Sequence, residues 1–84
     1  MSIYRKKPVL IEAFEYGVDK KPDWFNYALQ TGTIKYAAEG QTLLIKTLEG
    51  VMTAPLYHFI VRGVEGEIYG VDGVIFRKTY ELEQ

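Results

Sequence analysis

The second half of the chain is a series of short strand-forming segments separated by glycine turns, and no other feature limits the fold as strongly. The expected strands cover residues 42–47, 51–54, 57–62 and 67–71. The turns at residues 48–50 and 63–66 each place Glu-Gly where a tight hairpin favours a residue with positive φ. This part of the sequence therefore predicts an antiparallel meander of successive hairpins.

The first half predicts a strand, a helix and a second strand. Residues 8–16 carry apolar side chains on both faces of an extended segment, which predicts a central strand. The period changes in residues 19–32, where a helical stripe forms from Trp24, Phe25, Ala28 and Leu29. Asp19 or Asp23 is expected to cap this helix, and Gly32 suits its carboxyl end. Residues 33–37 are expected to form a short strand.

The last element, residues 73–81, is ambiguous because its β-branched content favours a strand, whereas Ile75, Phe76 and Tyr80 have helical spacing. We favour a helical turn that closes one end of the sheet. The expected fold is α+β, in one domain spanning residues 1–84. It has a small twisted antiparallel sheet of about five strands, in an SH3-like half barrel, with one helix after the first strand and the carboxyl-terminal helical turn.

The composition excludes several classes of function. Ten Lys and Arg residues against eleven Asp and Glu residues provide no positive surplus for a nucleic-acid polymer. No apolar run approaches the roughly 20 residues of a membrane span, and the basic start lacks a following apolar region, so we expect a cytoplasmic protein. Because there is no cysteine and one histidine, we expect no disulfide, no metal and no cofactor.

Two residues are candidates for catalysis, and neither supports it well. Glu12 lies in the most apolar run that holds a carboxylate, where burial would raise its pKa, but it could equally pair with Arg5 or Lys7. His58 would need a hydroxyl nucleophile, and the chain's one serine is Ser2 near the start of the sequence. We therefore expect a protein that is not an enzyme.

Aromatic and basic side chains suggest a binding role instead. His58 and Arg62 share one face of an expected strand, where they would read an anionic ligand or simply face solvent. A domain this small cannot bury all twelve of its aromatic rings, so some of the seven tyrosines and the one tryptophan are expected to line a partner or ligand surface. A basic cluster at residues 5–7 would meet phosphate or remain solvated. The candidate ligand-binding residues are Tyr57, His58, Arg62, Tyr69, Tyr16, Trp24, Arg5 and Lys6.

The motifs at residues 5–14, 47–54, 63–69 and 75–81 resemble a family of small uncharacterised proteins of bacteriophages and prophages. Where that family has Pro-Gly-Asp-Trp, this chain has Leu-Tyr-His-Phe at residues 56–59, so any role of the family's aspartate is in doubt. The resemblance implies a phage protein in the host cytoplasm. Such a protein would act by binding a host enzyme, a defence protein or a nucleotide signal.

These observations together favour a binding protein that counters host defence by sequestering a small nucleotide-like signal. Because the domain is small, we also expect a homo-oligomer. Two alternatives remain, an inhibitor or accessory factor that binds a host protein, and a small phage enzyme.

Overall fold

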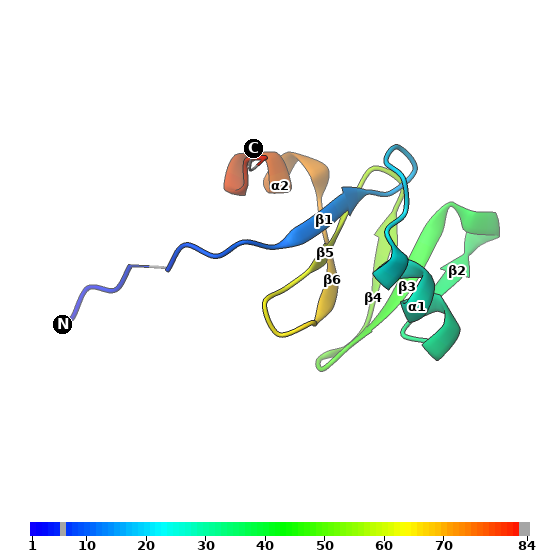
Figure 1. Ribbon diagram of the computed structural model, residues 1–84, viewed down its shortest axis with the longest axis horizontal. Coiled ribbons are helices and arrows are strands. Elements are labelled where there is room, and N and C mark those ends of the chain that lie inside the picture. The colour runs from blue at the N-terminus through cyan, green and yellow to red at the C-terminus, as the bar shows by residue number, and fades with distance from the viewer. Residues whose placement is uncertain (6, 83–84) are drawn as a thin grey trace.

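The computed structural model describes residues 1–5 and 7–82, which form an α+β fold with six strands in two antiparallel sheets (Figure 1). Sheet A has the order β1-β5-β6 and consists of β1 (Glu12–Glu15), β5 (Phe59–Arg62) and β6 (Ile68–Val71). Sheet B has the order β2-β3-β4 and consists of β2 (Ile34–Ala37), β3 (Thr42–Thr47) and β4 (Gly50–Pro55). The helices are α1 (Asp23–Thr31), α2 (Gly73–Thr79) and a short 3-10 turn, η1 (Ala38–Gly40).

Both predicted hairpins are present, and their turns use glycine as expected. β3 and β4 pair from Thr47 opposite Gly50 onward, and Gly50 has a φ of 118°. β5 and β6 are joined through a turn in which Gly66 has a φ of 83°. A side chain with a Cβ atom adopts such left-handed conformations at a cost, which explains why glycine marks these turns in the sequence.

The two helices are also where the sequence placed them, although the first is shorter. α1 ends at Gly32, which adopts the expected left-handed conformation with a φ of 81°. Its N-cap is Pro22, without a side-chain cap, and Asp19 instead accepts a hydrogen bond from the backbone N–H of Glu15. The predicted helical turn is confirmed as α2, where the Asp72 carboxylate accepts hydrogen bonds from the backbone N–H groups of Val74 and Ile75.

The main core lies between the inner faces of the two sheets and α1. Phe25 of α1 is fully buried and meets Phe14 of β1 and Tyr36 of β2 edge to face, with ring centroids 5.2 Å and 6.3 Å away. The other buried members come from both sheets and from α1: Tyr16, Ala28, Ile34, Leu43, Ile45, Ala54 and Ile60. One aromatic ring of α1 therefore joins the two sheets into a single core.

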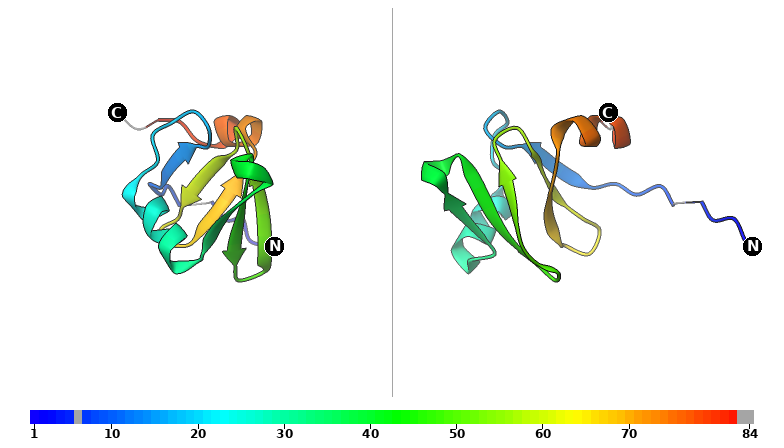
Figure 2. Two further views of the ribbon diagram at one scale, coloured as in Figure 1. Left: turned by 90° about the vertical axis from the view of Figure 1, so that its right-hand side faces the viewer. Right: turned by 180° about the vertical axis from the view of Figure 1, so that it is seen from behind.

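Two expectations about the sheet require correction. The structure has six strands in two sheets rather than one sheet of about five; the described strands close no barrel, and the SH3-like half barrel is not confirmed. β1 is an edge strand and not a central one. α2 lies beside sheet A (Figure 2) and stacks Phe76 on Phe59 of the outer face at 4.0 Å, whereas Ala13 on the outer face of β1 is exposed. Phe14 of β1 packs in the core and Ala13 faces outward without being buried, so apolar residues on both faces of this segment do not require a strand on either side.

Residues 1–5 and 7–11 continue the direction of β1 as an extended arm that leads away from the body (Figures 1 and 2). Several apolar side chains of this arm are exposed, including Ile3, Tyr4 and Leu10. Among the described residues, no helix is both long and apolar enough to cross a membrane.

Candidate ligand cleft

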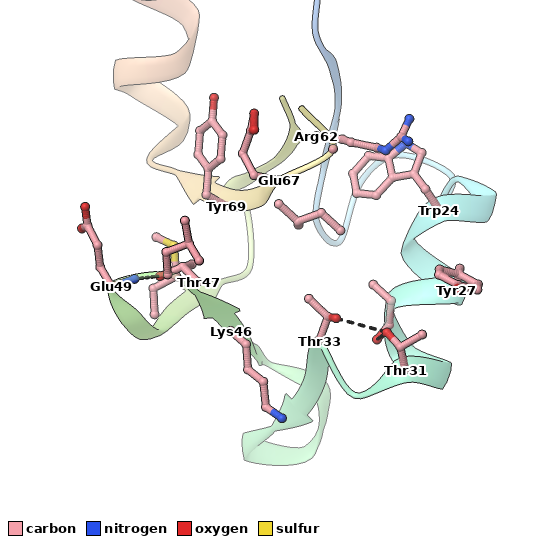
Figure 3. A pocket seen from close by; sticks show the side chains of 15 residues that line it. Trp24, Tyr27, Thr31, Thr33, Lys46, Thr47, Glu49, Arg62, Glu67 and Tyr69 are labelled. Atoms are coloured by element: carbon pink, nitrogen blue, oxygen red, sulfur yellow. Dashed lines mark hydrogen bonds between the residues drawn. The ribbon is translucent and has the colours of Figure 1, made fainter. Parts of the chain in front are cut away.

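A cleft of about 830 Å³ opens between α1, the tip of the β3–β4 hairpin and the β5–β6 hairpin (Figure 3). Its size falls within the usual range for small-molecule sites. Apolar side chains that also pack against the core form part of its wall, namely Trp24, Met52 and Ile68. Polar residues of the lining include Thr31, Thr33, Thr47 and Arg62. Below, the cleft means this whole cavity.

Two threonines, one at the carboxyl end of α1 and one just after it, give the cleft a defined hydrogen-bonding character. The hydroxyl of Thr31 donates to the backbone carbonyl of Ala28, and it lies 3.1 Å from the hydroxyl of Thr33. Because the Thr31 proton is already used, Thr33 must donate its proton to Thr31. The Thr33 oxygen then has only acceptor capacity left, so it is suited to an amino or hydroxyl donor of a ligand.

Trp24 supplies the aromatic surface of the cleft. Its indole meets Phe14 edge to face, with centroids 5.6 Å apart and an interplanar angle of 63°. Phe14 is buried and in turn packs on Phe25, so the position of the indole is fixed by the main core. A half-buried indole held in this way can stack on a planar ligand ring without first becoming ordered.

Arg62 is a guanidinium of the cleft and is already paired. Its Nη1 atom donates to Oε1 of Glu12 at 3.2 Å, and the two side chains are 44% and 63% exposed. Because the pair is exposed, its strength is limited by solvent screening. A ligand phosphate could therefore compete with Glu12 for the guanidinium.

The charged residues of the cleft wall balance one another. Lys46 and Arg62 are cationic, and Glu49 and Glu67 are anionic. In Figure 3 the Lys46 side chain points away from Trp24 and Arg62, and Glu67 points away from the two threonines. The cleft therefore favours a ligand with modest negative charge over one with several phosphates.

Of the predicted site residues, Trp24, Arg62 and Tyr69 line the cleft. Tyr69 lies at its border, since Figure 3 shows its ring pointing away from Thr33. Burial raises the pKa of the Tyr69 phenol, and a hydrogen bond with Tyr80 raises it further. Tyr69 therefore belongs at least partly to the packing between sheet A and the segment after α2.

Tyr16 is a core residue and not a surface ligand group. Its side chain is 4% exposed, and its hydroxyl donates to the backbone carbonyl of Gly40 at 2.6 Å. Burial, followed by the proximity of Tyr36, raises the pKa of this phenol. The expectation that Tyr16 contacts a ligand is corrected because the hydroxyl is used to hold η1 against sheet A.

Tyr57 and His58 lie in the connection between β4 and β5, and neither is part of the cleft wall. His58 and Arg62 are four residues apart on an extended segment, a separation of about 13 Å. The backbone carbonyl of His58 accepts from Tyr16 N–H, and its own N–H donates to the carbonyl of Pro55. The expected His58–Arg62 pair is therefore not formed, because the strand places its two members at opposite ends.

Arg5 is exposed on the arm, away from the cleft, so the structure does not bring it together with Trp24 and Arg62. Lys6 lies outside the described residues.

Sequence reasoning missed Thr31, Thr33 and Ile68. Thr31 and Thr33 flank Gly32, and this Thr-Gly-Thr sequence at a helix end was the available signal. A glycine there predicts that the chain turns back on itself, which brings the two hydroxyls together. Ile68 had no comparable signal, because alternation in a short strand does not show which face meets a cleft.

No family model, curated protein or solved structure shows a significant match to this chain. Within residues 1–5 and 7–82, no group of three or more histidine, cysteine, aspartate or glutamate side chains is placed to hold a metal ion.

Proposed function

We propose that this chain is a non-enzymatic binding protein that holds a small nucleotide-like ligand in the cleft. The observation that carries the proposal is the placement of an indole, a guanidinium and a free hydroxyl acceptor around one cavity, by Trp24, Arg62 and Thr33. Stacking on the indole would hold a base, and the guanidinium would meet a single phosphate. The Thr33 oxygen would accept from an amino or hydroxyl group of the ligand.

The resemblance to small phage proteins supplies the setting of this proposal. In that setting the protein would act in the host cytoplasm by sequestering a nucleotide signal of host defence. The resemblance in the motifs supports the setting, and the cleft supports the ligand class. The two parts are independent, so the ligand class can be tested with purified protein alone.

Isothermal titration calorimetry against a panel of linear and cyclic mononucleotides tests the ligand class. We expect at least one member of the panel to bind with a Kd below millimolar. Thr33→Val removes the acceptor with little change in size and should weaken that binding about tenfold. Thr53→Val is the matched control, because Thr53 is exposed on β4 and lies outside the cleft lining.

Two results would count against the proposal. The first is the absence of measurable heat across the whole panel at millimolar ligand. The second is equal weakening by Thr33→Val and Thr53→Val, because a general loss of structure would then account for the effect.

A second candidate function, inhibition of a host protein, is favoured by exposed tyrosines. Tyr27 of α1 is 67% exposed, Tyr36 of β2 is 50% exposed, and Tyr57 is 60% exposed. Tyrosine is enriched in protein interfaces because it combines a large apolar ring with a polar tip. Affinity purification from host lysate separates the two functions, because a ligand-sequestering protein should recover no stoichiometric protein partner.

A further inference from the structure

The backbone of β1 has one unpaired edge. The hydrogen bonds around β1 show which residues point their N–H and C=O groups toward that edge. Tyr16 N–H donates to the carbonyl of His58 at 2.9 Å, so the residues of β1 that face β5 are the even-numbered ones. On the other side of β5, Gly63 N–H donates to the carbonyl of Glu67 at 2.8 Å, so the odd-numbered residues of β5 face β6. The even-numbered residues of β5 therefore face β1, which agrees with the assignment from Tyr16. The N–H and C=O groups of Ile11 and Ala13 therefore point away from the sheet.

Between residues 9 and 13, the free side of this edge carries no charged residue, and charge is one of the features that usually protect a sheet edge. β1 is the last strand of sheet A, and Val9, Ile11 and Ala13 along its free side are apolar. Natural sheets generally block such edges with proline, charge or a covering loop. Pro8 is even-numbered, so its missing N–H falls on the β5 side and leaves the free side able to pair.

The open stretch has a defined end. The Asp19 carboxylate accepts from Glu15 N–H at 2.9 Å, and the carbonyl of Glu15 accepts from the N–H groups of Val18 and Asp19. Pairing beyond residue 13 is therefore blocked by the turn that follows β1. Residues 7–10 are extended and exposed, with Leu10 74% and Val9 45% accessible.

We propose that β1 and the arm pair with the same segment of a second copy, antiparallel and about a two-fold axis at Ile11. Val9, Ile11 and Ala13 of each copy would then exchange backbone hydrogen bonds with Ala13, Ile11 and Val9 of the other. The two three-stranded A sheets join into one six-stranded sheet. A second copy fits because the edge is self-complementary, which a C₂ interface requires.

Charge favours this register over its neighbours. It places Lys7 of one copy opposite Glu15 of the other, and opposite charges across strands are stabilising. A shift of the axis to Glu12 would set two glutamates directly opposite each other. A shift of the axis to Leu10 would set Lys7 opposite the apolar Ala13, so the charge of Lys7 would lose its partner across the two strands.

The proposed dimer also determines where the two ligand clefts lie relative to each other. A two-fold axis perpendicular to the joined sheet keeps the inner faces of both copies on the same side. The two clefts, which open from those inner faces, would therefore lie on one side of the dimer. The dimer would therefore sequester two molecules of a small ligand, one in each cleft. Each cleft is complete within its own chain.

Disulfide cross-linking tests the register. Because the chain has no cysteine, an introduced cysteine can form a disulfide only with its copy in the other chain. In Ile11→Cys the two thiols would face each other across a hydrogen-bonded pair, with Cα atoms about 5.5 Å apart, within the range of a disulfide. We expect rapid formation of a covalent dimer under mild oxidation. Leu10→Cys is the matched control, since Leu10 is adjacent and exposed but lies opposite Glu12 in this register. Faster cross-linking of Leu10→Cys than of Ile11→Cys would overturn the register.

Light scattering of the unmodified protein tests the pairing itself. We expect a mass of two chains at about 100 µM. Ile11→Pro removes an N–H from the free edge and should shift the mass to one chain, whereas Leu10→Pro removes an N–H that faces the other side and should leave the dimer largely intact. Circular dichroism shows whether both variants are folded. A mass of one chain for the unmodified protein, or equal effects of the two folded proline variants, would overturn the proposal.

Discussion

Gly70 of β6 packs directly against Ala54 of β4, and a Cβ atom placed on Gly70 would lie 2.9 Å from the Cβ of Ala54. Gly70 N–H also donates to the sulfur of Met52 at 3.4 Å. β6 therefore crosses the inner face of sheet B at close range. This contact brings the two sheets together on one side of the molecule, next to the cleft.

We predict that Gly70→Ala destabilises the protein by about 1–3 kcal/mol, because the added methyl group overpacks a site bounded by a backbone and a buried side chain. The midpoint of thermal unfolding should fall by several degrees. The test is a double-mutant cycle with Ala54→Gly, which removes the opposing methyl group. The Gly70→Ala penalty should be smaller in that background. An equal penalty in both backgrounds would show that this contact is not its source.

Buried tyrosines should make the stability fall at alkaline pH. Burial raises the pKa of Tyr16 above the ordinary value of 10.0, so the folded chain holds this proton more tightly than the unfolded chain. The stabilising contribution is complete below the ordinary pKa and is lost as the pH rises through the folded pKa. Urea unfolding across this range should show a steeper decline for the unmodified protein than for Tyr16→Phe. Parallel declines would contradict the assignment to Tyr16.

Releasing Arg62 from its partner should strengthen the binding of phosphate-bearing ligands. Glu12→Gln removes the charge that the guanidinium now pairs with, and the pair is exposed, so the unfolding free energy should change by less than about 1 kcal/mol. We expect the affinity for a mononucleotide to rise severalfold. Glu15→Gln is the control, because Glu15 pairs with Arg77 and neither residue lines the cleft. An unchanged affinity in Glu12→Gln would remove Arg62 from the binding site.

The local elements of this fold could be predicted from the sequence, because their signals are local. Gly32, Gly50 and Gly66 each adopt the left-handed conformation that their positions suggested. The arrangement of the strands could not be predicted in the same way. Apolar residues on both faces of β1 are equally consistent with a central strand and with an edge strand, and the strand order, in which β1 pairs with β5 alone, decides between the two.

The candidate site was only partly predictable for a similar reason. Trp24 and Arg62 were selected by residue type, and the fold places both at one cleft. Tyr16 was selected by the same criterion, yet its hydroxyl is bound to Gly40 in the interior. Residue type indicates which side chains can bind a ligand, but the packing of distant strands determines which of them are exposed.

The central claim, that the cleft binds a nucleotide-like ligand, is most directly tested through Trp24, the one tryptophan of the chain. Its indole lies in the cleft wall, so its fluorescence reports on this site alone. Titration with mononucleotides should give a saturable change with a midpoint below millimolar, and Thr33→Val should shift that midpoint about tenfold to higher concentration. A signal that follows a free-tryptophan control at every nucleotide concentration would contradict the claim.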